Sequence, residues 1–474
     1  MNKIIGRKKE IGLLEEYERS NKAEFVVVCG RRRVGKTFLI RECYANRFAF
    51  YLSGAENTNK KAQLRNFNAA INTYSGYPYP AVTNWQDAFL QLQHYISNSQ
   101  TKKKLILFFD ELPWLDNNKS GFLSAFEYFW NTFASARNNI LLIACGSATS
   151  WIMNKIINSR GGLHNRVTQQ IFLEPFTLAE TEQFLKSRKI AMKRLQIVEC
   201  YMIMGGIPFY LEQIRKEVGL AQNIDNLFFT KNGILRNEFS RLFSSLFKRS
   251  ENHIKIIKVL GEKSKGLTRE EIIKTAQIAD GGRLTKMLEE LEMCGFIRID
   301  DSFNKKKKNR LYQLIDFFSM FYLNFIDGKK NLTDGYWLHI GGSSTYKSWL
   351  GFSFEKLCAS HLPQMRKKLG IFGVLSFTSA WRYFNKNGGA QIDLVIDRKD
   401  NVINLCEIKF STKPYQITKS DDADFQNKIA LFQEYTSTNK TIHFTLVSPF
   451  GAKRNEYLNE IQSEITMDDL FADI

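Results

Sequence analysis

The sequence predicts an α/β protein of several domains, and three observations lead to this prediction. A continuous apolar run at residues 25–29 passes directly into a glycine-rich loop and a helical segment, as a buried parallel strand does before its crossover helix. A second apolar run, at 105–109, ends in two acidic residues. Residues 389–396 and 402–410 read as two further strands that carry acidic and basic side chains. At roughly 100–200 residues per domain, the 474 residues correspond to about two to four domains.

The bulk composition narrows the class of protein. Hydrophobic residues make up 44% and charged residues 24% of the chain, which is typical of globular domains and argues against disorder, collagen or a coiled coil. The net charge of +19 favours a polyanionic partner such as nucleic acid. Segments 1–190 and 246–316 carry +11 and +5 of this charge, whereas 346–474 carries +1.

Targeting signals and cysteine motifs are missing from the sequence. The N-terminus lacks an apolar segment of signal-peptide length, and no stretch reaches about 18 uninterrupted apolar residues. The seven cysteines include no CxxC pair, and the six histidines have no ligand spacing. We therefore expect a cytoplasmic protein with reduced cysteines and no membrane partner.

The first apolar run leads into a phosphate-binding loop. Residues Gly30–Thr37 read GRRRVGKT, which is the GxxxxGK[ST] pattern in its strand–loop–helix context. The glycines let backbone N–H groups approach phosphate oxygens. We expect Lys36 to contact the β- and γ-phosphates and the Thr37 hydroxyl to hold Mg²⁺. The residues predicted to bind the nucleotide here are Gly30, Arg31, Arg32, Arg33, Val34, Gly35, Lys36, Thr37 and Phe38.

The second apolar run ends in Asp110 and Glu111, at the strand edge where open α/β sheets bind ligands. We expect Asp110 to hold Mg²⁺, directly or through water, and Glu111 to act as general base on the attacking water. A third run, at 140–145, precedes Ser147 and Thr149. Ser147 is the preferred sensor of the γ-phosphate, and Thr149 is the second candidate. These residues predict an ATPase, because a guanine-reading NKxD-like motif is missing.

Three short motifs surround this core. Gly6 and Arg7 belong to IGRKKE, Arg166 precedes LEPF, and Pro208 lies in GGIPFY. In this order the motifs resemble the archaeal-type ATPase clade of the AAA+ and STAND P-loop NTPases. The resemblance implies that Gly6 and Arg7 lie beside the adenine, and that Pro208 belongs to a helical lid against the base. It also implies a charge-stabilising role for Arg166, with a surface arginine as the alternative. No other arginine is a firm candidate for catalysis between subunits, so the sequence gives little support for such catalysis. A homo-oligomer is left open.

Residues 246–316 have the pattern of three helices followed by a hairpin, a winged helix-turn-helix. In the segment 283–295, apolar residues recur at i, i+3, i+4 and i+7 (Leu284, Met287, Leu288 and Leu291), and the strands read 296–299 and 311–314. The residues of this helix that lie outside the apolar positions, and would face a DNA groove, are Arg283, Thr285, Lys286 and Glu289. The hairpin residues predicted to contact phosphates are Lys305, Lys306, Lys307, Lys308 and Arg310. An interdomain strut with solvated charges is an equal alternative.

The C-terminal strands place Asp393 before Glu407-x-Lys409. Glu407 and Lys409 lie two apart and share a face of their strand. Two carboxylates suit Mg²⁺ or Mn²⁺, and a lysine can activate water for phosphodiester attack. The pattern resembles the PD-(D/E)XK nuclease fold and, more closely, an uncharacterised C-terminal domain often fused to archaeal-type ATPases. The resemblance implies Glu355 as a further acid, completed by Lys428 or Gln426. A solvated ion pair and an inactive site remain the alternatives.

The predicted organisation combines these parts. We expect a P-loop AAA+ core at 1–190, a helical lid at 191–245, a winged helix at 246–316, a connecting helix at 317–345 and a restriction-endonuclease-like α/β domain at 346–474. The leading hypothesis is a Mg-ATPase coupled to a DNA transaction, with metal-dependent cleavage by the last domain. The alternatives are an ATP-controlled assembly switch with a non-catalytic C-terminal domain and a transcription regulator that uses the winged helix.

Overall fold

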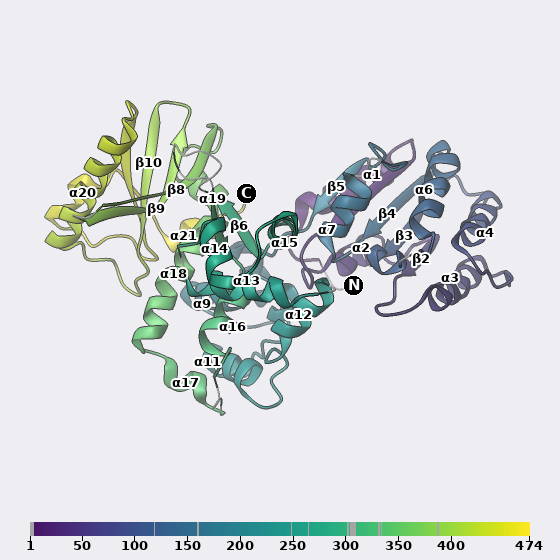
Figure 1. Cartoon of the computed structure of the whole chain (residues 1–474), viewed down its shortest axis with the longest axis horizontal. Coiled ribbons are helices and arrows are strands. Elements are labelled where there is room, and N and C mark those ends of the chain that lie inside the picture. The colour runs from purple at the N-terminus through teal and green to yellow at the C-terminus, as the bar shows by residue number, and fades with distance from the viewer. Residues whose placement is uncertain are drawn as a thin grey trace. The chain divides into compact units, whose positions relative to one another are not determined.

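The computed structural model describes residues 4–117, 119–158, 161–247, 249–263, 265–300, 303, 310–329, 332, 334–385 and 388–474 (Figure 1). The chain divides into two compact units, Met1–Pro175 and Phe176–Ile474. Each unit is built around one five-stranded sheet. The predicted α/β fold is confirmed, while the five domain boundaries stay predictions.

The first unit contains a parallel sheet in the order β2-β3-β4-β1-β5. Its strands are β1 (Glu24–Cys29), β2 (Phe50–Ser53), β3 (Leu105–Asp110), β4 (Ile140–Cys145) and β5 (Gln169–Phe172). Strands β1, β3 and β4 are buried along their whole length, as their continuous apolar sequences require. Because β4 lies between β1 and β3, the loops that follow these three strands meet at one edge of the sheet.

Helices surround this sheet (Figure 1). They are α1 (Lys8–Arg19), α2 (Lys36–Cys43), α3 (Lys60–Ser75), α4 (Trp85–Ser97), α5 (Leu112–Leu115), α6 (Phe122–Thr132) and α7 (Thr149–Ile152). Asparagine side chains cap α3 and α4, where Asn59 accepts from the N–H of Ala62 and Asn84 from that of Asp87. Aromatic side chains of α4, α6 and β3 form much of the core.

The second unit begins with a helical segment. Its helices are α8 (Leu178–Ser187), α9 (Arg194–Met204), α10 (Pro208–Leu211), α11 (Leu220–Ile224) and α12 (Glu238–Leu246). Helix α9 packs against α16 (Phe317–Phe325), where the rings of Tyr201 and Phe317 meet at 5.5 Å. The predicted connecting segment 317–345 therefore contains a core helix, α16, and a separate short helix, α17 (Tyr336–Ile340).

Three helices and an antiparallel hairpin follow the helical segment. They are α13 (Glu251–Glu262), α14 (Arg269–Ala276), α15 (Gly282–Met293), β6 (Ile297–Asp300) and β7 (Leu311–Leu314). The predicted apolar stripe of α15 is confirmed, because Leu284, Met287, Leu288 and Leu291 are all buried. Thr268 and Glu271 form a capping box at the start of α14. The predicted phosphate contacts Lys305, Lys306, Lys307 and Lys308 lie outside the described residues.

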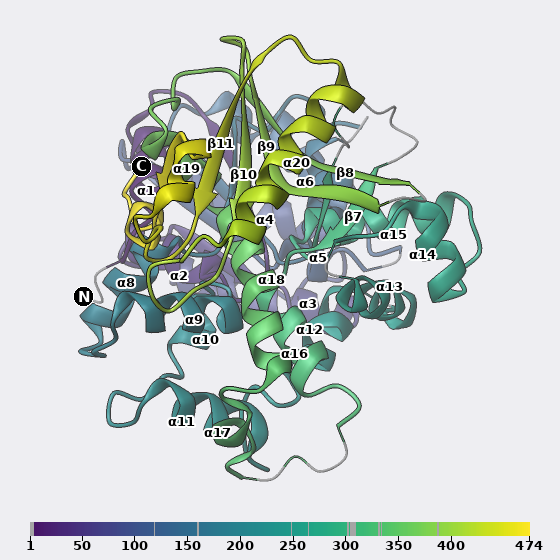
Figure 2. The same ribbon diagram turned by 90° about the vertical axis from the view of Figure 1, so that its left-hand side faces the viewer.

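The C-terminal sheet has the order β12-β11-β10-β9-β8, antiparallel from β8 to β10 and parallel from β10 to β12. Its strands are β8 (Ser376–Asn385), β9 (Gly388–Arg398), β10 (Val402–Ile408), β11 (Thr441–Val447) and β12 (Ser463–Ile465). Helix α20 (Lys419–Thr436) packs on β9 and α18 (Ser344–Ser360) on β10 (Figure 2). Two shorter helices, α19 (Leu362–Lys368) and α21 (Met467–Leu470), pack on each other.

A search of the described residues finds no helix with the length and apolar character needed to cross a membrane.

One glycine in the helical segment has a conformation that other residues avoid. Gly206 has φ 64°, and a Cβ there would lie 2.3 Å from the carbonyl oxygen of Phe176 and 2.6 Å from the Tyr201 ring. We predict that Gly206→Ala destabilises the second unit by at least about 1–3 kcal/mol. Gly351→Ala is the matched control, because this position in α18 has open space around it and should gain about 0.5–1 kcal/mol. Thermal unfolding of both variants measures the difference, and equal melting temperatures would contradict the assignment.

Candidate functional site

The phosphate loop connects β1 to α2. Lys36 is 5% exposed, and its Nζ donates to the carbonyl oxygens of Gly30 and Arg31 at 2.9 Å each. Gly30 has φ 140°, and a Cβ there would lie 2.4 Å from the Leu173 carbonyl oxygen. Only glycine therefore fits at the start of this loop.

The end of β3 faces the start of α2. The Thr37 hydroxyl donates to the Asp110 carboxylate at 2.9 Å, and Asp110 also accepts from the N–H of Glu111 at 3.0 Å. Burial raises the pKa of Asp110, and the negative charge of Glu111 raises it further. A hydroxyl and a desolvated carboxylate beside a second carboxylate are the oxygen ligands that suit Mg²⁺. The residues at this position therefore fit a magnesium ion.

The end of β4 contacts the second acid. Glu111 accepts from the Ser147 hydroxyl at 2.6 Å and from the Ser147 N–H at 3.1 Å. Thr149, the second candidate, is buried at the start of α7. Glu111 has φ 45°, one of three non-glycine residues in the left-handed region at this site, with Arg7 at 60° and Arg33 at 74°. Such conformations cluster at functional sites, where the surrounding structure holds them in place.

The remaining predicted nucleotide residues lie in several segments of the chain. Arg7, 5% exposed, donates to the Val34 carbonyl oxygen at 3.3 Å and follows Gly6 at the start of α1. Arg32 lies 4.0 Å from Glu56. The other four are placed as follows: Gly35 caps α2, Phe38 is exposed on α2, Arg166 is exposed in the turn before β5, and Pro208 begins α10 in the second unit.

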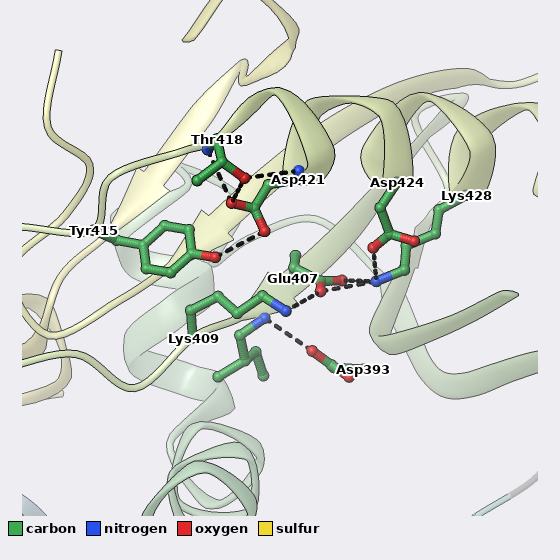
Figure 3. Close-up of polar contacts among 9 residues, drawn as sticks. Asp393, Glu407, Lys409, Tyr415, Thr418, Asp421, Asp424 and Lys428 are labelled. Atoms are coloured by element: carbon green, nitrogen blue, oxygen red, sulfur yellow. Dashed lines mark hydrogen bonds and ion pairs between the residues drawn. The ribbon is translucent and has the colours of Figure 1, made fainter. Parts of the chain in front are cut away.

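The C-terminal candidate residues converge on Glu407 (Figure 3). The Lys409 Nζ lies 2.8 Å from Glu407 Oε1, as the predicted shared face requires. Lys428 of α20 donates to both Glu407 oxygens at 2.8 Å and lies 2.9 Å from Asp424. Burial opposes a charged Lys428, but Glu407 and Asp424 together outweigh burial and raise the pKa of the lysine. Of the two helix residues that the sequence left open, Lys428 therefore reaches the acid, while Gln426 donates to Asp422.

Asp393 lies at an irregularity of β9. The register pairs Val395 with Ser379 and Ile392 with Trp381, so two residues of β9, Asp393 and Leu394, oppose one residue of β8. Such bulges redirect a side chain and occur next to active sites. The Asp393 carboxylate accepts from the N–H of Ile408 at 2.9 Å (Figure 3).

Asp393 and Glu355 of α18 line one pocket of about 140 Å³. Burial raises the pKa of Glu355 to about 8, and Asp393 adds to the shift. Burial likewise raises the pKa of Asp393 to about 6, with Glu407 as the second cause. Among the described side chains, no group of three or more His, Cys, Asp or Glu residues is arranged to hold a metal ion. Both Glu407 oxygens are ion-paired, so this site fits a divalent cation less well than the first.

Sequence reasoning missed the hairpin side of this pocket. Arg298 of β6 and Gln313 of β7 line it together with Lys356 of α18. Burial lowers the pKa of Lys356 to about 8, and the neighbouring Arg298 lowers it further. The only signal in the sequence was the position of Lys356 directly after Glu355.

The predicted nucleic-acid face of α15 is solvent-accessible. Its four residues, Arg283, Thr285, Lys286 and Glu289, are all exposed. Lys286 also lies 3.9 Å from Glu290 on the next turn. Arg310, in the hairpin loop directly before β7, is half-buried.

The parallel sheet, the loop between β1 and α2 and the acids after β3 define a P-loop nucleotide-binding protein. Residues 4–214 match the model of a family described as an ATPase domain predominantly from Archaea. The first unit is therefore the core of an ATPase domain.

Similar proteins include one that matches most of the chain and one that matches a short part of it. An uncharacterized protein of Methanocaldococcus jannaschii, MJECL04, is 25% identical over 412 residues, which cover 86% of this chain and 87% of that protein. An uncharacterized ATP-binding protein of the same organism, MJ0423, is 44% identical over 44 residues, 9% of this chain and 75% of that protein. Among solved structures, the Walker-type ATPase PABY2304 of Pyrococcus abyssi is 17% identical with a TM-score of 0.49, covering 68% of this chain and 96% of that one.

The raised pKa of Glu355 has a consequence for stability. Its pKa rises from 4.5 unfolded to about 8 folded, so between these values the folded state holds a proton that the unfolded chain releases. Stability then falls as pH rises, by up to about 1.4 kcal/mol per pH unit. Asp393 contributes in the same direction only up to about pH 6. We predict that Glu355→Gln flattens the dependence between pH 6 and 8.

Chemical denaturation at several pH values measures this slope. Glu217→Gln is the matched control, because this exposed loop residue undergoes the same change of charge. Parallel slopes for wild type and Glu355→Gln would contradict the assignment.

Proposed function

We propose that the first unit binds Mg-ATP with the phosphate loop and hydrolyses it with Glu111 as general base. The observation that carries this proposal is the pair of contacts from Thr37 to Asp110 and from Ser147 to Glu111, at 2.9 and 2.6 Å, beside the buried Lys36. The contacts link three neighbouring strands at one edge of the sheet, where phosphoryl transfer requires a cation site and a positioned base.

Each residue has a role in this proposal. Lys36 exchanges its two carbonyl partners for phosphate oxygens, because an ammonium group pairs more strongly with an anion than with a neutral acceptor. Thr37 and Asp110 hold Mg²⁺, which supplies neutralisation of charge on the phosphates when it is bound. Ser147 orients the Glu111 carboxylate through two hydrogen bonds. Glu111 accepts a proton from the attacking water.

The outer residues follow the resemblance to the archaeal-type AAA+ and STAND clade. Gly6 and Arg7 are proposed to lie beside the adenine, which the contact from Arg7 to Val34 in the phosphate loop supports. Pro208 is proposed as a lid residue and Arg166 as the charge-stabilising arginine. The exposed position of Arg166 suits a side chain that must reach a ligand.

We further propose that ATP turnover is coupled to work on nucleic acid by the second unit. The net charge of +19 and the exposed Arg283 and Lys286 of α15 support a polyanionic partner. The cluster of Asp393, Glu407 and Lys409 supports metal-dependent cleavage as the reaction.

A specific observation favours the alternative of an ATP-controlled switch with a non-catalytic C-terminal domain. Both Glu407 oxygens are engaged by lysines, which competes with metal binding.

The ATPase proposal predicts different effects on nucleotide binding and hydrolysis for two substitutions. Lys36→Ala should abolish nucleotide binding or turnover, because it removes the cation of the loop. Glu111→Gln should bind ATP but lower the rate of hydrolysis by about 10²–10⁴-fold, since the amide cannot accept the proton. Lys61→Ala, on the exposed surface of α3, is the matched control. Phosphate release and ATP retention measure these effects, and hydrolysis that survives in both variants would show that the site is assigned wrongly.

The cleavage proposal predicts metal-dependent nuclease activity of the full chain with Mg²⁺ or Mn²⁺, with and without ATP. Asp393→Ala and Lys409→Ala should each lower this activity at least about 100-fold, while the exposed Lys413→Ala should leave it unchanged. Activity that is missing in the wild type, or unaffected by the first two substitutions, would favour the switch.

A further inference from the structure

The pocket beside Asp393 has walls from two different parts of the second unit. Asp393 of β9 and Glu355 of α18 form one side, and Arg298 and Gln313 of the β6–β7 hairpin form another. The Lys356 ammonium group donates to the Gln313 side chain and so attaches α18 to the hairpin. The pocket is therefore shared between the hairpin and the C-terminal sheet.

Cations outnumber acids by four to three among the residues that line the pocket. Lys356 is only 9% exposed, and the side-chain hydrogen bond found for it is to a neutral amide. Arg298 lies beside it, paired with Asp300 at 2.7 and 3.0 Å. Neighbouring cations repel strongly where water is excluded, and a bound anion relieves this repulsion. The ionisable residues that line the pocket are the cations Lys265, Arg298, Lys356 and Arg382 and the acids Asp300, Glu355 and Asp393.

The size of the pocket limits the ligand. At about 140 Å³ it is smaller than the roughly 300–1,000 Å³ that hold drug-sized molecules. It has room for a few water molecules, at about 30 Å³ each. A single phosphate group fits such a space.

We propose that this pocket binds one backbone phosphate of a nucleic-acid strand, with Lys356 and Arg298 as its ligands opposite Asp393. The inference rests on the proposed function of the second unit, because it names the substrate contacts of the same site. The net charge of segment 346–474 is only +1, and the hairpin adds Arg298 to the cations that this segment contributes to the pocket. Contacts to phosphate alone make the binding independent of base sequence.

The test measures strand binding without cleavage. A fluorescent single-stranded oligothymidylate is titrated with the full chain in EDTA, without ATP, at several salt concentrations. Lys356→Met should weaken binding about tenfold and lower the slope of log affinity against log salt by about one. The double variant Lys356→Met/Gln313→Leu removes both hydrogen-bonding partners, so that no buried amide is left unpaired. Lys216→Met, in an exposed loop, is the control for a lost charge.

A second pair of substitutions tests the pocket independently, in case the Lys356 variants misfold. Arg298→Gln/Asp300→Asn replaces the ion pair by neutral amides and should also weaken binding. Wild-type affinity and salt slope in these folded variants would overturn the proposal, as would an equal loss in Lys216→Met. Cleavage by wild type and Asp393→Ala is measured separately with Mn²⁺. If strand binding depends on Lys356 but no cleavage is detected, the phosphate pocket is retained and the nuclease proposal is rejected. If the wild type cleaves the strand and Lys356→Met binds it unaltered, the nuclease proposal is retained and the phosphate pocket is rejected.

Discussion

A charged side chain that is removed from water must have a partner, and this constraint organises both candidate sites. In the first unit, Lys36 is satisfied by two carbonyl oxygens of its own loop, and Asp110 by the Thr37 hydroxyl. In the second unit, Glu407 is held by Lys409 and Lys428. Two of these contacts join different elements, because Thr37 of α2 donates to Asp110 of β3 and Lys428 of α20 donates to Glu407 of β10.

The strand order of the first sheet brings these charged and polar residues together in one site. Strand β4 separates β1 from β3, so that Ser147 after β4 meets Glu111 after β3. A parallel sheet gathers such strand ends at one edge, and the buried apolar strands below keep that edge rigid. The left-handed conformation of Glu111 is tolerated there because both its carboxylate oxygens accept hydrogen bonds from Ser147.

Much of this arrangement could be predicted from the sequence. The phosphate loop, the acids after β3 and the stripe of α15 follow local patterns of glycine, apolar and acidic residues, which depend on near neighbours in the chain. The shared face of Glu407 and Lys409 follows from strand periodicity. The wall formed by Arg298 and Lys356 could not be found in this way. It depends on how a hairpin packs on a distant helix, and no periodic pattern encodes that contact.

The pocket between the hairpin and the C-terminal sheet also bears on how such chains evolve. Its lining residues come from both sides of residue 346, so a recombination event at that point would inherit half a pocket. Gln313 and Lys356 would each lose the partner that satisfies it inside the protein. The hairpin and the sheet therefore depend on each other to form this pocket. We expect recombination between relatives to transfer both parts together.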